Sequence, residues 1–371
     1  MSQEIMYVGV DVDDKAFHGA VVTRSGEEVA EFSAKPNLKA LIEKLEKLSP
    51  ARSRFKICYE AGYLGFTLGR DLIKAGYFCE IVAPSLIPQV RGKVAKTDRL
   101  DSARLARFYS KSMLVPIHIP DSNEEEVRDL VRSRLYQRQK LTGLKNYLLG
   151  LCRRTGLHFK LETGSKSHWT KTHLEWLEKK VKEQRPIPQF NLSLLIEEYR
   201  HQKNLIQKYD KRILLLSSED RYRKKVEALT CYRGVDTTAA MALISEIGDV
   251  TRFSHPHRLT SFAGLDIREY SSGGKEKKFG ITKAGNSVIR TTSIESCQKA
   301  LCKPSIGSDL KRRRREADPK FIKVADRCMS RLHRKGMRLQ ARGKHTNKVK
   351  VACAREMLSF FWESLKLAQA A

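Results

Sequence analysis

The stretch IMYVGVDVDDKAFHGAVVTRSGEEVAEFSA, residues 5–34, decides the fold of the N-terminal part of the chain. It holds three apolar runs rich in β-branched residues, separated by the short polar turns Asp13-Asp14-Lys15 and Ser25-Gly26. Closely spaced runs of this kind predict an antiparallel meander of three strands. The predicted strands are 5–12, 16–23 and 27–34.

Alternating strands and helices follow the meander. NLKALIEKLEKL has leucines and isoleucine at helical spacing after Asn37, which is a good N-cap. The remaining predicted elements are a strand over 54–62, a helix over 66–76, a strand over 77–84 and a helix over 99–111. The order β-β-β-α-β-α-β-α predicts a mixed sheet covered by helices.

The rest of the chain is mainly helical by pattern. Long periodic stretches cover 124–154 and 191–229, and the segment 156–190 contains the break between them. Helices of this length indicate a coiled-coil-like arm or a dimerising bundle. Beyond them, we expect a helical C-terminal part, with a polar loop over 268–280 and a basic helical tail. The predicted domains are 1–115, 116–226 and 227–371.

The charge of the chain points to a polyanionic partner. The 371 residues carry 71 Lys and Arg against 42 Asp and Glu, a formal net charge of +29. The excess is uneven, because residues 1–60 are near neutral whereas 301–371 hold 19 basic and 6 acidic residues. A basic, folded chain most often binds nucleic acid, although a solvated basic surface is the simpler alternative.

Other counts exclude several classes of protein. No apolar run approaches the roughly 20 residues of a membrane span, and the acidic N-terminus does not resemble a signal peptide. The eight cysteines form no CxxC pair and no zinc-type spacing with histidine. We therefore expect free thiols and a cytoplasmic location, with no membrane partner.

Four carboxylates stand at positions suited to metal binding. Asp11 and Glu60 end two predicted strands, and Asp98 and Asp101 lie three residues apart at the start of a predicted helix. Hard oxygen ligands of this kind suit Mg²⁺ or Mn²⁺, and a pair of such ions can stabilise a phosphodiester displacement. Taken singly, each acid could instead be a turn residue, a solvated strand end, an N-cap or a first-turn acid. Together, within a basic protein, they favour the metal site.

The cations Arg91, Lys93, Lys96 and Arg99 surround Asp98. Such residues can hold a phosphate backbone against bound metals, and their simpler interpretation is a solvated basic face.

Two blocks of sequence resemble a known family. The first combines GVDV (9–12), YEAG (59–62) and KTDRLDSARLA (96–106), and the second runs from LTCYRGVDTTAAMALISEIGDVTRF (229–253) to SFAGLDIREYSSGGKEKKFGITKAGNSVIR (261–290). Both blocks, in this order and spacing, resemble the DEDD transposases of the insertion-sequence one-ten family, with its eleven-eleven subgroup. These enzymes are bridge-RNA-guided recombinases.

The resemblance implies a fold, a reaction and partners. The first domain would be RNase H-like, similar to the Holliday-junction resolvase RuvC, with Asp11, Glu60, Asp98 and Asp101 as its catalytic, metal-binding acids. A serine before glycine would be the nucleophile, which is Ser272 here, with Ser271 as the alternative. The implied partners are target and donor DNA, a noncoding guide RNA and further copies of the chain, in a dimer of dimers whose active site joins acids of one subunit to the serine of another. The implied location is cytoplasmic and nucleoid-associated, in a bacterium or archaeon.

Further residues are candidates for nucleic-acid contacts. Gly234 lies in a segment similar to a helix-hairpin-helix, although an ordinary turn between helices competes with that interpretation. Tyr270 is a conceivable nucleophile, but a stacking or packing role fits it better. The remaining candidates are basic: Lys275, Lys277, Lys278, Lys283, Arg290, Arg312, Arg313 and Arg314.

Two other functions stay open at this stage. A structure-selective nuclease of the resolvase type would use metal and water and would form no covalent protein–DNA adduct. A non-catalytic nucleic-acid-binding protein would show no Mg²⁺-dependent cleavage at all. The four acids argue against the second alternative, whereas the basic helices do not distinguish it.

Overall fold

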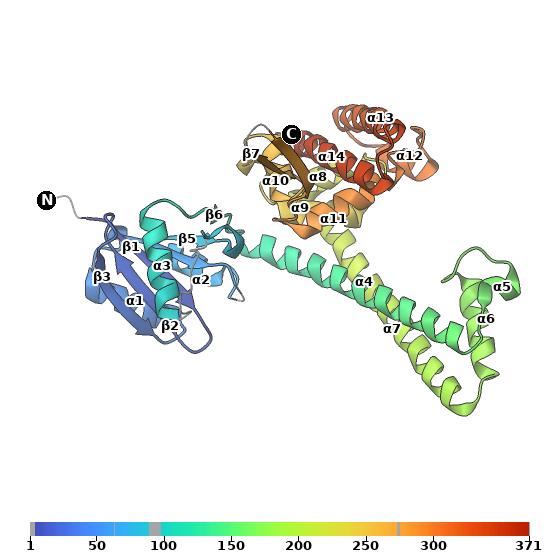
Figure 1. Ribbon diagram of the computed structural model, residues 1–371, viewed down its shortest axis with the longest axis horizontal. Helices are drawn as coiled ribbons and strands as arrows, with labels where there is room; N and C mark the ends of the chain where they lie inside the picture. The colour runs from blue at the N-terminus through green and yellow to red at the C-terminus, as the bar shows by residue number, and fades with distance from the viewer. Residues whose placement is uncertain (1–3, 63, 89–97, 273–274, 371) are drawn as a thin grey trace. The chain divides into compact units, whose positions relative to one another are not determined.

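The computed structural model describes residues 4–62, 64–88, 98–272 and 275–370. The chain forms two compact units, Met1–Asp121 and Ser122–Ala371 (Figure 1). The first unit is built on a mixed sheet, and the second is mostly helical. A mixed α/β unit followed by a helical remainder agrees with the predicted fold class and is compatible with an RNase H-like first domain.

The first unit holds a six-stranded sheet in the order β3-β2-β1-β4-β5-β6. The meander pairs antiparallel, β1, β4 and β5 run parallel, and β6 returns antiparallel. The sequence predicted every one of these elements except β6. Their bounds are β1 (Met6–Val12), β2 (Phe17–Val22), β3 (Glu28–Ala34), α1 (Leu38–Leu48), β4 (Phe55–Glu60), α2 (Thr67–Lys74), β5 (Phe78–Val82), α3 (Asp98–Ser110) and β6 (Pro116–Ile117).

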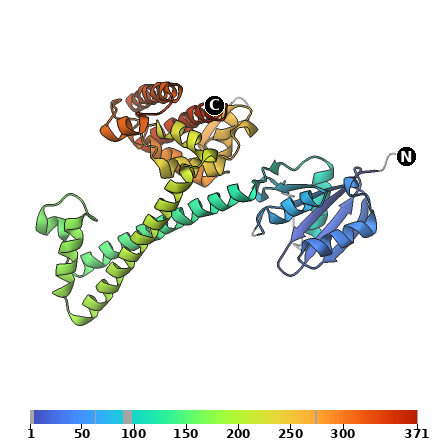
Figure 2. The same cartoon turned by 180° about the vertical axis from the view of Figure 1, so that it is seen from behind.

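Helices cover both faces of this sheet. The alternate residues Val8, Val10, Ile57 and Tyr59 form one core with leucines of α1 and α2. The other face packs against α3, which lies in front of the strands in Figure 1 and behind them in the reverse view of Figure 2. Side chains alternate along a strand, so successive residues face α3 and the α1–α2 pair in turn.

Two long helices form the arm of the second unit. Helix α4 (Ser122–Arg154) packs against α7 (Pro186–Ser217), and Arg134 of α4 pairs with Asp210 of α7 at 2.8 Å. The segment between them is not a simple break, because it folds into α5 (Phe159–Thr163) and α6 (Lys171–Lys182). These helices close a separate core at the end of the arm.

The predicted helix over 191–229 is interrupted in the structure. Helix α7 ends at Ser217, and two residues separate it from α8 (Asp220–Thr230). The hydroxyls of Ser217 and Ser218 donate to the carbonyl oxygen of Leu214, at 2.7 and 3.4 Å. Serines that bond back to the preceding turn compete with helix continuation, so the prediction of one continuous helix was wrong here.

The C-terminal helices pack around one large core. The basic tail folds, as expected, with α13 and α14 side by side (Figure 1). No helix among the described residues is long and apolar enough to span a membrane. The elements after α8 are α9 (Thr237–Ile247), α10 (Pro256–Phe262), β7 (Ile267–Ser272), β8 (Lys275–Ile281), α11 (Ser287–Ser296), α12 (Ser308–Arg314), α13 (Pro319–Ala341) and α14 (Thr346–Gln369).

Candidate active site

Asp11 and Glu60 lie at the same edge of the sheet. The parallel pairing of β1 with β4 ends at Val10 opposite Tyr59, and Asp11 and Glu60 are the next residue on each strand. Both side chains are half-buried. Equal steps beyond a register pair keep two residues side by side on one face, so these acids are neighbours at the carboxyl ends of their strands.

The face that carries these acids is the one covered by α3. Tyr7 packs edge-on against Tyr109, with ring centroids 5.6 Å apart, and a Cβ on Gly9 would lie 2.4 Å from backbone atoms of Ser102 and Ala106. Helix α3 therefore runs antiparallel to β1 across this face. By the same progression, the first turn of α3 lies nearest to Asp11. That turn begins at Asp98 and includes Asp101.

The structure describes three of the four acidic side chains. Asp101 is 20% exposed and accepts an ion pair from Arg104 at 3.1 Å. For Asp98 only the backbone position, at the start of α3, is described. Among the side chains that are described, no three His, Cys, Asp or Glu are grouped closely enough to hold a metal ion.

Two neighbours of this site were missed by the sequence analysis. His18 of β2 stands directly opposite Asp11 in the antiparallel register, so it shares the α3 face. Glu80 of β5 points to the same helix, where it accepts a hydrogen bond of 2.6 Å from the Tyr109 hydroxyl. Burial and this bond raise the pKa of Tyr109, which stays a neutral donor. Strand pairing could have found His18, but sequence alone does not give the register.

Gly9 makes the close approach of α3 to β1 possible, and we predict that Gly9→Ala disturbs it. The added Cβ would meet two backbone atoms at 2.4 Å, so the helix itself must move. We expect the free energy of unfolding to fall by about 1–3 kcal/mol, as for other overpacked sites, and recombination to fall with it. Urea denaturation of the two proteins measures the change in stability.

Gly62→Ala is the matched control for stability. Its Cβ would meet nothing closer than the Glu60 carbonyl oxygen at 3.9 Å. If Gly9→Ala is as stable as Gly62→Ala, close contact with α3 does not require glycine at position 9.

The donor set of the site suits a hard divalent cation. The four candidate acids would offer only carboxylate oxygens to such an ion. Carboxylates at two strand ends and one helix start match the ligand preference of Mg²⁺ and Mn²⁺.

The serine motif lies on a β-hairpin, which corrects the expected polar loop over 268–280. Strands β7 and β8 pair antiparallel, with Ser272 opposite Lys275 and Ser271 opposite Glu276. The two glycines 273 and 274 lie outside the described residues, as do the side chains of 270–272 and 275–278. A Gly-Gly pair between alternating segments is itself a hairpin signal, and the sequence analysis overlooked it.

The base of this hairpin is fixed to the helical core. Asn286, which follows β8, donates from its backbone to Phe262 at 2.7 Å and from its side chain to Glu246 at 2.6 Å. The Glu246 carboxylate is 1% exposed and also accepts two hydrogen bonds from Arg132 on α4, from Nε at 2.7 Å and from Nη2 at 3.0 Å. One buried carboxylate thus ties the arm to the segment that carries the serines. Glu246 was missed because burial of an isolated glutamate has no local sequence signature.

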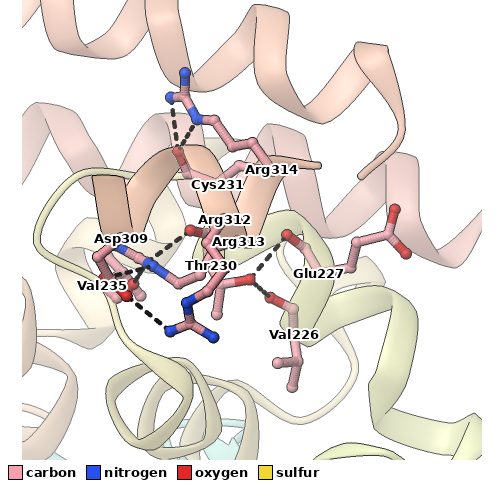
Figure 3. Close-up of polar contacts among 9 residues, drawn as sticks. All are labelled: Val226, Glu227, Thr230, Cys231, Val235, Asp309, Arg312, Arg313 and Arg314. Carbon is pink, nitrogen blue, oxygen red and sulfur yellow. Dashed lines mark hydrogen bonds and ion pairs between the residues drawn. The ribbon is translucent and has the colours of Figure 1, made fainter. Parts of the chain in front are cut away.

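Two of the predicted phosphate ligands make hydrogen bonds within the protein (Figure 3). The Arg314 side chain is 6% exposed, donates twice to the Cys231 carbonyl oxygen at 2.9 and 2.7 Å, and pairs with Asp326 at 2.7 Å. Arg313 donates to the carbonyl oxygens of Thr230, at 2.7 Å, and Val235. These arginines cap the end of α8, so they are occupied within the protein.

Arg312 differs from its two neighbours. Its side chain is 73% exposed and pairs only with Asp309, at 2.8 Å, among the described contacts. It remains available to solvent.

The candidate Gly234 lies in the turn between α8 and α9. Gly234 has φ +90°, and a Cβ there would lie 2.4 Å from the Ser296 carbonyl oxygen, so packing alone requires glycine. Asp236 caps the following helix by accepting from Ala239 at 2.7 Å, which places a carboxylate where a phosphate would bind. These contacts favour the ordinary turn between helices.

Two basic candidates flank the serine hairpin. Arg290 donates to the Ala263 carbonyl oxygen at 2.9 Å, whereas Lys283 is exposed. The candidates Arg91, Lys93 and Lys96, and the side chain of Arg99, lie outside the described residues.

Comparison with known proteins finds a family match for each of the two blocks of sequence. Residues 226–310 match the family described as "Transposase IS116/IS110/IS902 family", and residues 8–155 match a family described as "Transposase" and named for the DEDD transposases of IS110. These segments contain the acids and the serine hairpin described above.

Individual relatives agree with these family matches. A putative transposase, y4qE, of Sinorhizobium fredii is 32% identical over 365 residues, which cover 96% of this chain and 87% of the relative. The transposase for insertion sequence element IS1533 of Leptospira borgpetersenii is 29% identical over 91% of this chain and 98% of its own length. The transposase for IS1111A of Coxiella burnetii is 24% identical over 62% of each chain. The chain therefore belongs to the IS116/IS110/IS902 family of transposases, whose activity is DNA transposition.

Proposed function

We propose that this transposase cuts and joins DNA with two groups of residues: the acids Asp11, Glu60, Asp98 and Asp101, and the hydroxyl of Ser272. The observation that carries the proposal is the meeting of β1, β4 and the first turn of α3 at one edge of the sheet. We infer from this backbone arrangement that the four acids, which come from two strand ends and one helix start, face a common site.

The acids would hold divalent cations, Mg²⁺ or Mn²⁺. Ions bound there would stabilise negative charge on the attacking and departing oxygens of a phosphodiester. The protein's own part is to fix the carboxylates: Asp11 and Glu60 on a sheet packed on both faces, and Asp101 on a helix that Gly9 lets approach closely.

The serine would act as the nucleophile. Its oxygen forms a bond to phosphorus while the bond from phosphorus to a deoxyribose oxygen breaks. Ser272 loses one proton and the departing oxygen gains one, so the step balances and can be reversed to rejoin strands without an energy source. Ser272 is favoured over Ser271 because it directly precedes a glycine, as the nucleophilic serine does in the family that the chain resembles.

We also propose that a noncoding guide RNA directs the protein and that it works as an oligomer. The net charge of +29 and the resemblance to RNA-guided recombinases support this part.

Removal of divalent cations tests the proposed function. We expect EDTA to lower recombination between plasmids carrying the element ends and the target by more than about 10³-fold, since the charge on both oxygens loses its stabilisation. Excess Mg²⁺ or Mn²⁺ should restore it, while DNA binding in a gel-shift assay stays unchanged. Full recombination in EDTA would contradict the proposed role of the acids.

A further inference from the structure

Helix α13 presents a single row of cations to solvent. Its basic residues at 320, 323, 327, 331, 334 and 338 are separated by three or four positions. At 3.6 residues per turn, these positions fall within an arc of about 80° on the helix surface. All six residues are exposed, and they are Lys320, Lys323, Arg327, Arg331, Arg334 and Arg338. We call this row the α13 stripe.

Most of the charge on the stripe is not neutralised within the protein. Arg327 pairs with Glu363, and Arg331 with Glu356 at 2.6 Å, both acids being on α14. The other four members have no ion pair among the described residues. The opposite face of α13 carries Phe321, Cys328 and Leu332, which are buried in the C-terminal core. Packing therefore fixes the helix so that the stripe faces outward.

A groove runs beside the stripe. It has a volume of about 580 Å³. It is lined by three arginines of the stripe, by Phe360 and Trp362 of α14, and by the two glutamates that pair with Arg327 and Arg331. The guanidinium of Arg327 lies 5.5 Å from the centre of the Phe360 ring. Both aromatic side chains are half-buried, and the Trp362 indole donates to the Phe253 carbonyl oxygen at 2.9 Å, which holds its ring in place.

We propose that the α13 stripe and this groove bind single-stranded nucleic acid. The cations, about one helical turn apart over about 27 Å, would follow the phosphates, and an unstacked base would enter the groove against Phe360. A positive track beside aromatic rings is the arrangement by which proteins hold single strands, and a duplex keeps its bases stacked and out of reach of such a groove. This inference rests on the proposed function only in taking nucleic acid as the partner.

The charge of the stripe can be tested with four substitutions in the full-length protein. We compare wild type with K320Q/K323Q/R334Q/R338Q, using fluorescence anisotropy and a labelled 20-nucleotide single strand, as RNA and as DNA, over a range of salt. The matched control is K166Q/K179Q/K182Q/R185Q, which removes the same charge from exposed, unpaired positions of the arm among the residues described. Circular dichroism confirms that each variant is folded.

Loss of four phosphate contacts lowers the slope of log affinity against log salt by about 3 for a single strand. We expect this change in the stripe variant and not in the arm control. An equal change in both proteins would show that net charge alone is responsible and would overturn the proposal. The difference between the RNA and DNA strands identifies which of the two the stripe prefers.

Phe360→Leu tests the groove separately. This change keeps an apolar side chain and removes the stacking ring, so we expect single-strand affinity to fall about tenfold and affinity for a 20-base-pair duplex to stay the same. Equal losses for both ligands, or none for the single strand, would overturn the groove assignment. The binding assay requires neither metal nor Ser272, so its failure is distinct from failure of the proposed catalytic site.

Discussion

Asp11→Asn should abolish recombination while leaving the protein folded. Asparagine has the same shape as aspartate but lacks its charge, so the proposed metal site would lose a carboxylate ligand. We expect activity to fall by more than about 10³-fold, because stabilisation of charge by bound metal contributes several kcal/mol to the transition state. The measurement is recombination between donor and target plasmids, with the thermal midpoint of unfolding measured in parallel.

Asp13→Asn provides the control for this experiment. Asp13 is an exposed acid two residues away, and its carboxylate accepts from the backbone of Lys15 at 3.0 Å in the turn after β1. We expect Asp13→Asn to recombine like wild type. Recombination by a folded Asp11→Asn protein at the wild-type rate would remove Asp11 from the catalytic site.

Ser272→Ala should eliminate both recombination and the covalent protein–DNA adduct. Without the hydroxyl no oxygen is available to form the bond to phosphorus, so we expect a loss on the order of 10⁴-fold or more, as for other removed nucleophiles. The adduct is detected as a shifted band after denaturation of the reaction with end-labelled DNA.

Ser271→Ala decides between the two serines. It leaves Ser272 opposite Lys275 in the hairpin and should keep the adduct. If Ser271→Ala loses the adduct and Ser272→Ala retains it, the assignment is reversed. If both variants cleave DNA like wild type and no adduct forms, the enzyme is a nuclease that uses water as its nucleophile.

Local sequence patterns predicted most of the first unit. Alternating strands and the helix over 37–48 were found because each has its own periodicity, and Asn37 caps α1 as expected by accepting from Ala40 at 2.9 Å. The sequence placed Asp11 and Glu60 at the ends of two predicted strands. It did not predict that His18 lies opposite Asp11, because the register between strands depends on contacts between residues that are distant in the sequence.

Charge was a less reliable guide than periodicity. The run of arginines at 312–315 has the composition of a surface track, yet Arg314 is buried by tertiary contacts with Cys231 and Asp326. The cations of the α13 stripe are dispersed in the sequence and become a row only when the helix forms. Local composition does not show which arginines bond to buried carbonyl groups. Helical spacing, together with a buried apolar face, does show which cations of a helix lie in one exposed row.

We propose that Asp11, Glu60 and the first turn of α3 surround one divalent cation site. The most direct test replaces Mg²⁺ by Fe²⁺, generates hydroxyl radicals with ascorbate and peroxide, and maps backbone cuts by mass spectrometry. We predict cuts near residues 11, 60 and 98–101 together, suppressed by excess Mg²⁺ and absent in Asp11→Asn. Cuts at only one of these segments, or cuts that persist in Asp11→Asn, would show that the three segments do not share one cation site.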